Sequence, residues 1–90
     1  MDVIVSARFA KDVDKLPDKN FRNKLAIIIV DLQQCKLLSQ IKNCKKLKGF
    51  KNAYRIKVGD YRLGFLYVNE KIYLGRVMHR KEIYRYFPET

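Results

Sequence analysis

The chain has 90 residues, of which 48% are hydrophobic, which suffices for one modest core and predicts a single domain over residues 1–90. No segment approaches the run of about 18 apolar residues that a membrane helix needs, and the first residues lack the regions of a signal peptide. We therefore expect a cytoplasmic protein with no membrane partner. Twenty Lys and Arg against nine Asp and Glu leave a formal net charge of +11, which favours a polyanionic partner. A solvated basic surface or an acidic protein partner would also account for it.

The first third of the chain predicts a strand and two helices. Residues 1–5 are short and β-branched, as in a strand. Ser6 can cap a helix that Pro17 ends, and Asp18 can cap a second helix. Apolar residues recur at helical spacing in both: Phe9, Val13 and Leu16, then Phe21, Leu25, Ile28, Leu32 and Cys35. The run LAIIIV makes the second helix so apolar that we expect it to be buried broadly against a sheet.

The rest of the chain predicts three strands. Residues 36–43 indicate a loop or a short helical turn. Strands over residues 53–58, 61–68 and 71–78 follow, joined by the two-residue turns Gly59-Asp60 and Asn69-Glu70. The closing segment HRKEIYRYF predicts a last helical turn or tail. The order β-α-α-β-β-β predicts an α+β fold, with an antiparallel sheet and two helices packed on one face.

The first turn predicts a pairing of two cations. It places Lys57 directly opposite Arg62, on the face that the helices leave open. The residues predicted to share the face under the helices are Tyr54, Ile56, Leu63 and Phe65. Like charges opposite each other cost stability, and a phosphate between them would turn the repulsion into attraction. Long cationic side chains can equally splay into water.

The second turn predicts a floor without side chains on the open face. It places Gly64 opposite Gly75, and glycine inside a strand often marks the close approach of another chain or ligand. Strand parity puts His79 on the same face. Arg76 does not fit, because it falls on the core face opposite Leu63. Either its side chain reaches the margin of the sheet or a bulge shifts the register.

Tyrosines and cysteines divide by context. Tyr54, Tyr61 and Tyr67 share the core parity and are predicted to pack, whereas Tyr73 faces the open side and could stack on RNA. Cys35 and Cys44 lie outside any CxxC or CxxH context, which favours plain thiols over a zinc site or a disulfide. With one His and no paired carboxylates at useful spacing, the sequence predicts no metal and no cofactor.

Two motifs carry a resemblance to a known family. The segment LKGFKNAYRIKVGDYRLGF, residues 47–65, is followed by RVMHRKEIYRYF, residues 76–87. Together they resemble the RelE/ParE toxin superfamily, on its RelE-like side. The resemblance implies the toxin of a type II toxin–antitoxin pair, a metal-free endoribonuclease that enters the ribosomal A site and cuts translated mRNA. It also implies a cognate antitoxin, whose neutralising segment we expect to be acidic or amphipathic.

The resemblance assigns roles to individual residues. Arg62 and Arg80 match arginines of the family, and a guanidinium can hold two phosphate oxygens. Tyr84 matches a tyrosine that stacks on a base or assists proton transfer. His79 is a candidate acid or base, because histidine titrates near neutrality, and a hydrogen-bonded structural histidine is the alternative. Where RelE has a lysine this chain has Arg55, so Lys57 is the candidate lysine base.

The basic segment from Lys42 to Arg62 supplies most of the remaining candidates. It holds eight cations and one acid. The predicted RNA-binding residues are Lys48, Lys51, Arg55, Tyr73 and Lys81. Two other functions share the fold, because ParE-like members poison DNA gyrase and a degenerate member could bind antitoxin or nucleic acid without catalysis. Arg62, His79, Arg80 and Tyr84 together favour cleavage, since a gyrase poison has no chemical reason to keep them.

Overall fold

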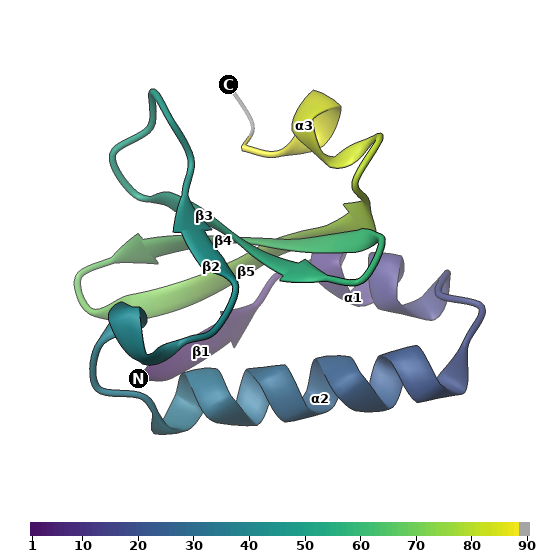
Figure 1. The fold of residues 1–90 in the computed structure, drawn as a ribbon, viewed down its shortest axis with the longest axis horizontal. Helices are drawn as coiled ribbons and strands as arrows, with labels where there is room; N and C mark the ends of the chain where they lie inside the picture. The colour runs from purple at the N-terminus through teal and green to yellow at the C-terminus, as the bar shows by residue number, and fades with distance from the viewer. Residues whose placement is uncertain (89–90) are drawn as a thin grey trace.

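The computed structural model describes residues 1–88 and folds as one five-stranded sheet with two helices on one face and a short third helix on the other (Figure 1). The elements in chain order are β1 (Asp2–Val5), α1 (Ala7–Asp14), α2 (Lys19–Gln34), a 3-10 turn (Leu38–Gln40), β2 (Cys44–Lys46), β3 (Ala53–Val58), β4 (Tyr61–Val68), β5 (Lys71–His79) and α3 (Ile83–Tyr86). Within residues 1–88, no helix is long and apolar enough to cross a membrane. The predicted α+β class is confirmed.

Both long helices begin where the sequence predicts. The Phe9 amide donates a hydrogen bond to Ser6 Oγ at 3.0 Å, which caps α1. The Asn20 amide donates to Asp18 Oδ1 at 2.9 Å, which caps α2. Each cap satisfies a backbone donor that the first turn of a helix leaves without an intrahelical partner. Local side-chain chemistry therefore determines both starting points.

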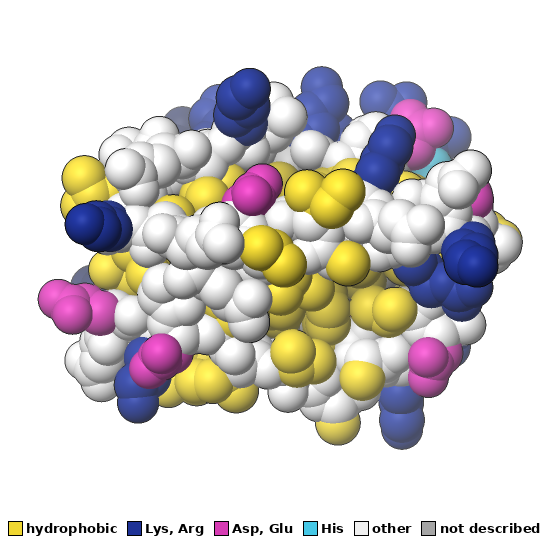
Figure 2. All heavy atoms as spheres, turned by 90° about the horizontal axis from the view of Figure 1, so that it is seen from below, with side chains coloured by type: hydrophobic (Ala, Val, Ile, Leu, Met, Phe, Trp, Pro, Cys, Tyr) yellow, Lys and Arg dark blue, Asp and Glu magenta, His cyan; other side chains and the backbone are white. Residues whose placement is uncertain are grey.

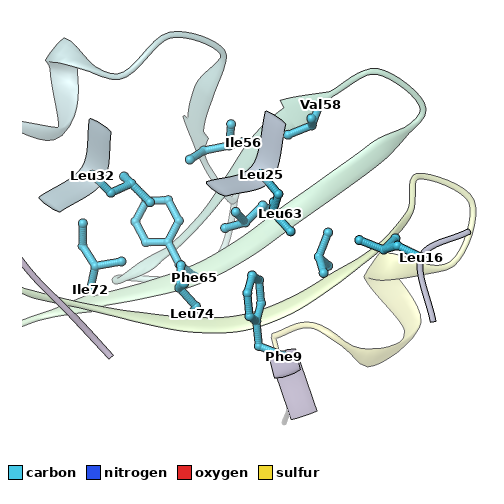
Figure 3. Packing of buried hydrophobic residues seen from close by; sticks show 11 residues of the cluster. Phe9, Leu16, Leu25, Leu32, Ile56, Val58, Leu63, Phe65, Ile72 and Leu74 are labelled. Atoms are coloured by element: carbon cyan, nitrogen blue, oxygen red, sulfur yellow. The ribbon is translucent and has the colours of Figure 1, made fainter. Parts of the chain in front are cut away.

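The main core lies between these helices and the sheet (Figure 3). Its buried residues come from the predicted helix faces and from alternate positions of the strands: Phe9, Leu16, Leu25, Leu32, Ile56, Val58, Leu63, Phe65, Ile72, Leu74 and Val77. Tyr54, Tyr61 and Tyr67 pack against it, as predicted. Each large side chain buried in this way contributes about 1.5–3 kcal/mol, so this face carries most of the hydrophobic stabilisation.

The broad burial expected of α2 is wrong. Leu25 and Leu32 are buried, but Ile27 is 62% exposed and Val30 is 45% exposed. Figure 2, which views the molecule from below, shows hydrophobic side chains across the middle of the surface that α2 helps to form, with charged side chains around the border. A helix that packs on one side only leaves the other side of an apolar run in solvent. The apolar surface of the LAIIIV segment is thus broader than the side of α2 that packs against the sheet.

The sheet is mixed rather than antiparallel, with strand order β1-β5-β4-β3-β2. β1 runs parallel to β5, pairing Asp2 with Lys71 and Val5 with Leu74. A parallel pair needs a long connection, and the whole chain between these strands supplies it. β2, a short edge strand that pairs antiparallel with β3, was not predicted from the sequence. A strand of three or four residues carries no local signal of whether it lies at the edge of a sheet or runs parallel to its neighbour.

The registers of both hairpins agree with prediction as far as Gly75, where the second one shifts. β3 and β4 pair as predicted, with Lys57 opposite Arg62. In the next hairpin Phe65 pairs with Leu74, but Gly64 pairs with Arg76, so Gly75 is an extra residue in a β-bulge. The predicted pairing of Gly64 with Gly75 is therefore wrong, and the bulge accounts for the anomaly at Arg76. Every residue after the bulge lies on the face opposite to the one that simple alternation predicts.

Candidate nucleic-acid interface

The open face of the sheet carries a small second cluster of apolar side chains. Ala53, Ile83 and Phe87 are buried there, and they pack with Leu47, Leu66 and Met78. These residues come from the loop after β2, from the middle strands and from α3. The cluster therefore attaches the C-terminal segment to the sheet, on the side away from α1 and α2 (Figure 1).

The glycine floor is not open. A Cβ atom on Gly64 would lie 2.5 Å from the Phe87 ring, and one on Gly75 would lie 2.8 Å from it. Phe87 is 4% exposed, so its ring occupies the space that both glycines leave. The two glycines do mark a close approach of chain to sheet, as expected of strand glycines. The approaching group is a side chain of the same protein, which corrects the expectation of a free groove at this point.

Three predicted catalytic cations meet around the Gly59-Asp60 turn. Lys57 is exposed and lies opposite Arg62. The Arg80 amide donates to the Asp60 carbonyl at 2.8 Å, which brings the C-terminal basic segment to the same turn, and Arg80 itself is exposed. Residues distant in sequence are thus gathered at one end of the hairpin. Two exposed cations and the buried Arg62 therefore concentrate positive charge at this end of the sheet, which favours an anion.

Arg62 is more than a surface cation. It is only 9% exposed, and its Nη1 donates to the carbonyls of Gly59 and Tyr61, both at 2.9 Å. Hydrogen bonds to a charged group are stronger than neutral ones, so these bonds hold the turn in shape. They also offset the repulsion expected between Arg62 and Lys57. The Arg62 side chain therefore stabilises the turn, in addition to its predicted role in holding a phosphate.

His79 lies on the other side of the sheet from the predicted one. The bulge pairs it with Tyr61, and the two rings meet edge to face with centroids 5.6 Å apart. It borders a hollow of about 360 Å³ that Asp12 and Glu82 also line. Its Nδ1 accepts a hydrogen bond from the Lys81 amide at 3.2 Å, so a neutral imidazole carries its proton on Nε2. In that tautomer Nε2–H can donate a hydrogen bond.

An ion pair ties α1 to β5 immediately beyond the bulge. Asp12 accepts two hydrogen bonds from the Arg76 guanidinium, at 2.8 and 3.1 Å, and a third from the Val77 amide at 3.1 Å. The hydrogen bond to Asp12 raises the pKa of Arg76. The Tyr86 ring lies 5.5 Å from the guanidinium carbon, within cation–π range. Sequence reasoning missed this pair, and its only signal was the misfit of Arg76.

A second hollow brings together Tyr84, a predicted catalytic residue, and Lys48, a predicted RNA-binding residue. It measures about 370 Å³ and lies between the loop after β2 and the C-terminal segment. Its lining residues are Leu47, Lys48, Phe50, Tyr84, Arg85, Phe87 and Pro88. Tyr84 is 56% exposed and Phe50 is 39% exposed. Phe50 and Arg85 are additions to the predicted set, and a large apolar residue inside the turn sequence LKGFKN was the available signal.

The remaining predicted RNA-binding residues are more dispersed. Arg55 donates from Nη1 to the Asn43 carbonyl at 2.9 Å, so part of its guanidinium supports the loop before β2. Lys51 and Lys81 are exposed. Tyr73 is 37% exposed and pairs with Leu66 near the start of β5, at the opposite end of that strand from His79. The structure does not bring Tyr73 to the Gly59-Asp60 turn.

Cys35 and Cys44 form no disulfide. Cys35 is buried and Cys44 is half-buried, both as free thiols. Burial raises the pKa of the Cys44 thiol, with Arg55 acting in the opposite direction and Cys35 adding to the rise. Over residues 1–88, no group of three or more His, Cys, Asp or Glu side chains could hold a metal ion.

These features define a small basic α+β protein whose sheet has one helix-covered face and one cation-lined face. Comparison with known proteins specifies the class. A family model described as the ParE toxin of the type II toxin–antitoxin system parDE matches residues 3–84. Toxin RelE3 of Methanocaldococcus jannaschii is 40% identical over 89 residues, which cover 98% of this chain and 100% of that toxin. The chain belongs to the RelE/ParE superfamily of type II toxins, and to its RelE-like side.

Solved structures agree with this assignment. The toxin of the RelB-RelE antitoxin–toxin complex from Methanococcus jannaschii superposes with a TM-score of 0.79 at 38% identity, covering 94% of this chain and 99% of that one. The intact Escherichia coli RelBE complex matches with a TM-score of 0.69 at 23% identity, over 87% of this chain and 94% of that one. The second likeness shows the shared fold alone.

Proposed function

We propose that this toxin is a ribosome-dependent endoribonuclease that cuts translated mRNA without a metal. The observation that carries the proposal is the convergence of Lys57, Arg62 and Arg80 on the Gly59-Asp60 turn. Transfer of a phosphoryl group needs fixed positive charge where negative charge develops, and this turn supplies it on a rigid hairpin. The family membership and the strongly basic composition support the same substrate class.

The reaction is an attack of the ribose 2′-oxygen on the adjacent phosphorus. The 2′-hydroxyl loses its proton to a base, the phosphorus–5′-oxygen bond breaks, and the 5′-oxygen takes a proton from an acid. The products are a 2′,3′-cyclic phosphate and a 5′-hydroxyl. Arg80 and Lys57 stabilise the phosphorane charge. Tyr84 is the favoured proton-transfer group, since His79 lies on the other side of the sheet.

The partner that we propose is a cognate antitoxin with an acidic or amphipathic neutralising segment. Acidic side chains would complement the cations of the open face. An apolar stripe would fit the exposed Ile27 and Val30 of α2, because exposed apolar patches mark interaction surfaces. Similar toxins have been solved as complexes with antitoxins, which supports this proposal.

A gyrase poison is the second candidate, because the matching family model is that of ParE toxins. The test is controlled expression in bacteria with mapping of mRNA 5′ ends, beside an Arg80→Ala control. Cuts within translated frames that vanish in the control support the nuclease. A DNA-damage response with intact transcripts would support the gyrase poison instead. Growth unaffected by either protein, with antitoxin binding intact, would indicate a noncatalytic member.

A further inference from the structure

We propose that Asp12 is a positioning residue for the proposed cleavage, because its carboxylate fixes the second half of β5 and thereby the place of Arg80. The inference rests on the proposed function, since it concerns the same site. Asp12 lies on α1 and accepts hydrogen bonds from the Val77 amide at 3.1 Å and from the Arg76 guanidinium at 2.8 and 3.1 Å. These contacts join residues more than sixty positions apart.

The second half of β5 is supported by a helix rather than by a strand. The parallel ladder with β1 ends at Leu74, and α1 follows β1 directly. Ser6, the cap of α1, donates from Oγ to the Gly75 carbonyl at 3.2 Å, and the Val77 amide donates to Asp12. Buried backbone groups need partners, and an edge strand leaves its outer ones unpaired. Side chains of α1 therefore take the place of a neighbouring strand along this half of β5.

This half of the strand has two possible registers. With the bulge, Gly64 pairs with Arg76, whereas regular pairing would join Gly64 to Gly75 and turn every later side chain to the other face. Asp12, which is 6% exposed, bonds Arg76 in the bulged register. Buried ion pairs add little net stability, because desolvation offsets their attraction, but their fixed geometry can select one arrangement. The arrangement selected here is the bulged one.

The register fixed by Asp12 determines where the C-terminal segment is held. At the start of this segment, the Arg80 amide donates to the Asp60 carbonyl at 2.8 Å. Near its end, the Tyr86 ring lies 5.5 Å from the guanidinium carbon of Arg76, which Asp12 holds. Loss of the Asp12 carboxylate should therefore displace the segment between these two attachments without removing any side chain from it.

A displacement of this kind should affect the rate of cleavage more than the binding of RNA. Binding is spread over many exposed cations, whereas stabilisation of the transition state needs Arg80 in one place. A misplacement of about 1 Å lowers a rate by up to about 10²-fold, so Asp12→Asn should lower the single-turnover rate on saturating ribosome-bound mRNA by roughly 10- to 100-fold. The Kd for the same complex should stay within about twofold of the parent.

Three variants separate positioning from a loss of stability. Asp14→Asn makes the same chemical change at an exposed position of α1 and should cleave at the parental rate. Ile72→Val weakens the core in the first half of β5, before the bulge, and should lower the urea midpoint without lowering the rate of the folded protein. Arg76→Lys keeps a cation beside Asp12 but loses the paired donors, so it should show the pattern of Asp12→Asn at smaller size, and it replaces that variant if Asp12→Asn does not fold.

Hydrogen exchange in the purified toxin provides a readout that needs no ribosome. Asp12→Asn should speed exchange at the Val77 and Arg80 amides while exchange in the first half of β5 stays parental, and Asp14→Asn should change neither. A parental cleavage rate in Asp12→Asn, an equal rate loss in Ile72→Val, or a weakened Kd that accounts for the whole loss would overturn the positioning role.

Failure of this inference and failure of the proposed function are distinguishable. A parent protein that cuts no mRNA would refute the nuclease, and exchange would then decide the role of Asp12 by itself. Local acceleration at Val77 and Arg80 would support the positioning of this segment, whereas unchanged or uniformly faster exchange would overturn it. Conversely, cleavage by the parent and by Asp12→Asn at one rate would retain the nuclease and refute the inference.

Discussion

The two faces of the sheet differ in how they are covered. The face under α1 and α2 holds the large core, while the open face holds Ala53, Ile83, Phe87 and the neighbours that pack on them. Proteins open locally where few apolar contacts are buried. The helix-covered face should therefore determine global stability, and the open face can carry the cations, the hollow and the C-terminal segment at small cost. The structure thus separates the large core from the proposed site across one sheet.

The strongest test compares two phenylalanines on opposite faces. Phe65 is fully buried under the helices, and Phe87 is 4% exposed on the open face. Phe65→Ala should lower the free energy of unfolding by about 3–5 kcal/mol, because a cavity is left in the main core. Phe87→Ala should cost about 1–2 kcal/mol in global unfolding, since its segment can detach first. Urea denaturation measures both, and equal losses would mean that the faces are one cooperative unit.

Substitution of an exposed cation should have the opposite effect, with a large loss of activity and little loss of stability. Arg80→Ala removes an exposed cation beside the Gly59-Asp60 turn, and loss of one such group lowers the rate of a charge-developing reaction by roughly 10²–10³-fold. Its unfolding midpoint should stay within experimental error of the parent, because the side chain is exposed and its backbone hydrogen bond to Asp60 remains. Single-turnover cleavage of ribosome-bound mRNA measures the rate. Cleavage at the parental rate would remove Arg80 from the mechanism.

The paired cations Lys57 and Arg62 sharpen the comparison within one face. Arg62→Gln should destabilise the protein by about 1.5–3 kcal/mol, because it loses charge-assisted hydrogen bonds to the Gly59 and Tyr61 carbonyls. Lys57→Gln should stay within about 0.5 kcal/mol of the parent and lower the salt dependence of RNA binding. Thermal unfolding and filter binding separate the two. Equal stability of both variants would show that the turn does not depend on Arg62.

A methyl group tests how the C-terminal segment is attached. Gly64→Ala would place a Cβ 2.5 Å from the Phe87 ring, so we expect the ring to leave and a cost of about 1–3 kcal/mol. Hydrogen exchange in residues 80–88 should rise while exchange in β4 stays slow. Adding Phe87→Ala should make the Gly64→Ala change nearly neutral, because the clash is gone. Additive losses would show that Phe87 does not occupy the glycine floor in solution.

The smallest expected effect concerns Cys44, which packs against the helix-covered core. Burial raises its pKa, so the neutral thiol persists in the folded protein to a higher pH than in the unfolded chain. Its contribution to stability is therefore present at lower pH and lost as the pH rises through the folded-state pKa. In a Cys35→Ala background, alkylation at pH 8 should be slower in the native than in the denatured protein. Equal rates would mean that this edge of the core is open to water.

Local rules predicted much of the fold. Ser6 and Asp18 mark the helix starts because a cap is a contact within three residues, and the β3–β4 register follows from a two-residue turn. The direction of β1 depends on a partner more than sixty positions away. The Gly75 bulge depends on packing against α1 and Phe87. Neither is encoded in a short segment.

The candidate site divides in the same way. Motif resemblance assigned roles to Arg62, Arg80 and Tyr84 from residue type and spacing, and those roles stay predictions. The prediction that His79 lies on the open face was wrong, because the unpaired Gly75 upstream shifts the alternation of side chains along β5 by one residue. The hydrogen bonds of Arg62 to its own turn, and the placing of Phe50 beside Tyr84, depend on chain geometry that spacing does not specify.

The bulge at Gly75 has a consequence for how this strand tolerates insertions and deletions. Because Gly75 is the residue left without a partner, a chain lacking it would pair Phe65 with Leu74 and Gly64 with Arg76 in an unbroken ladder. Every later side chain would then keep its present face. A substitution keeps the extra residue and adds a Cβ 2.8 Å from the Phe87 ring. A relative that lacks the residue at position 75 should therefore keep each side chain on its present face of the sheet. A relative with alanine there would have to move the Phe87 ring.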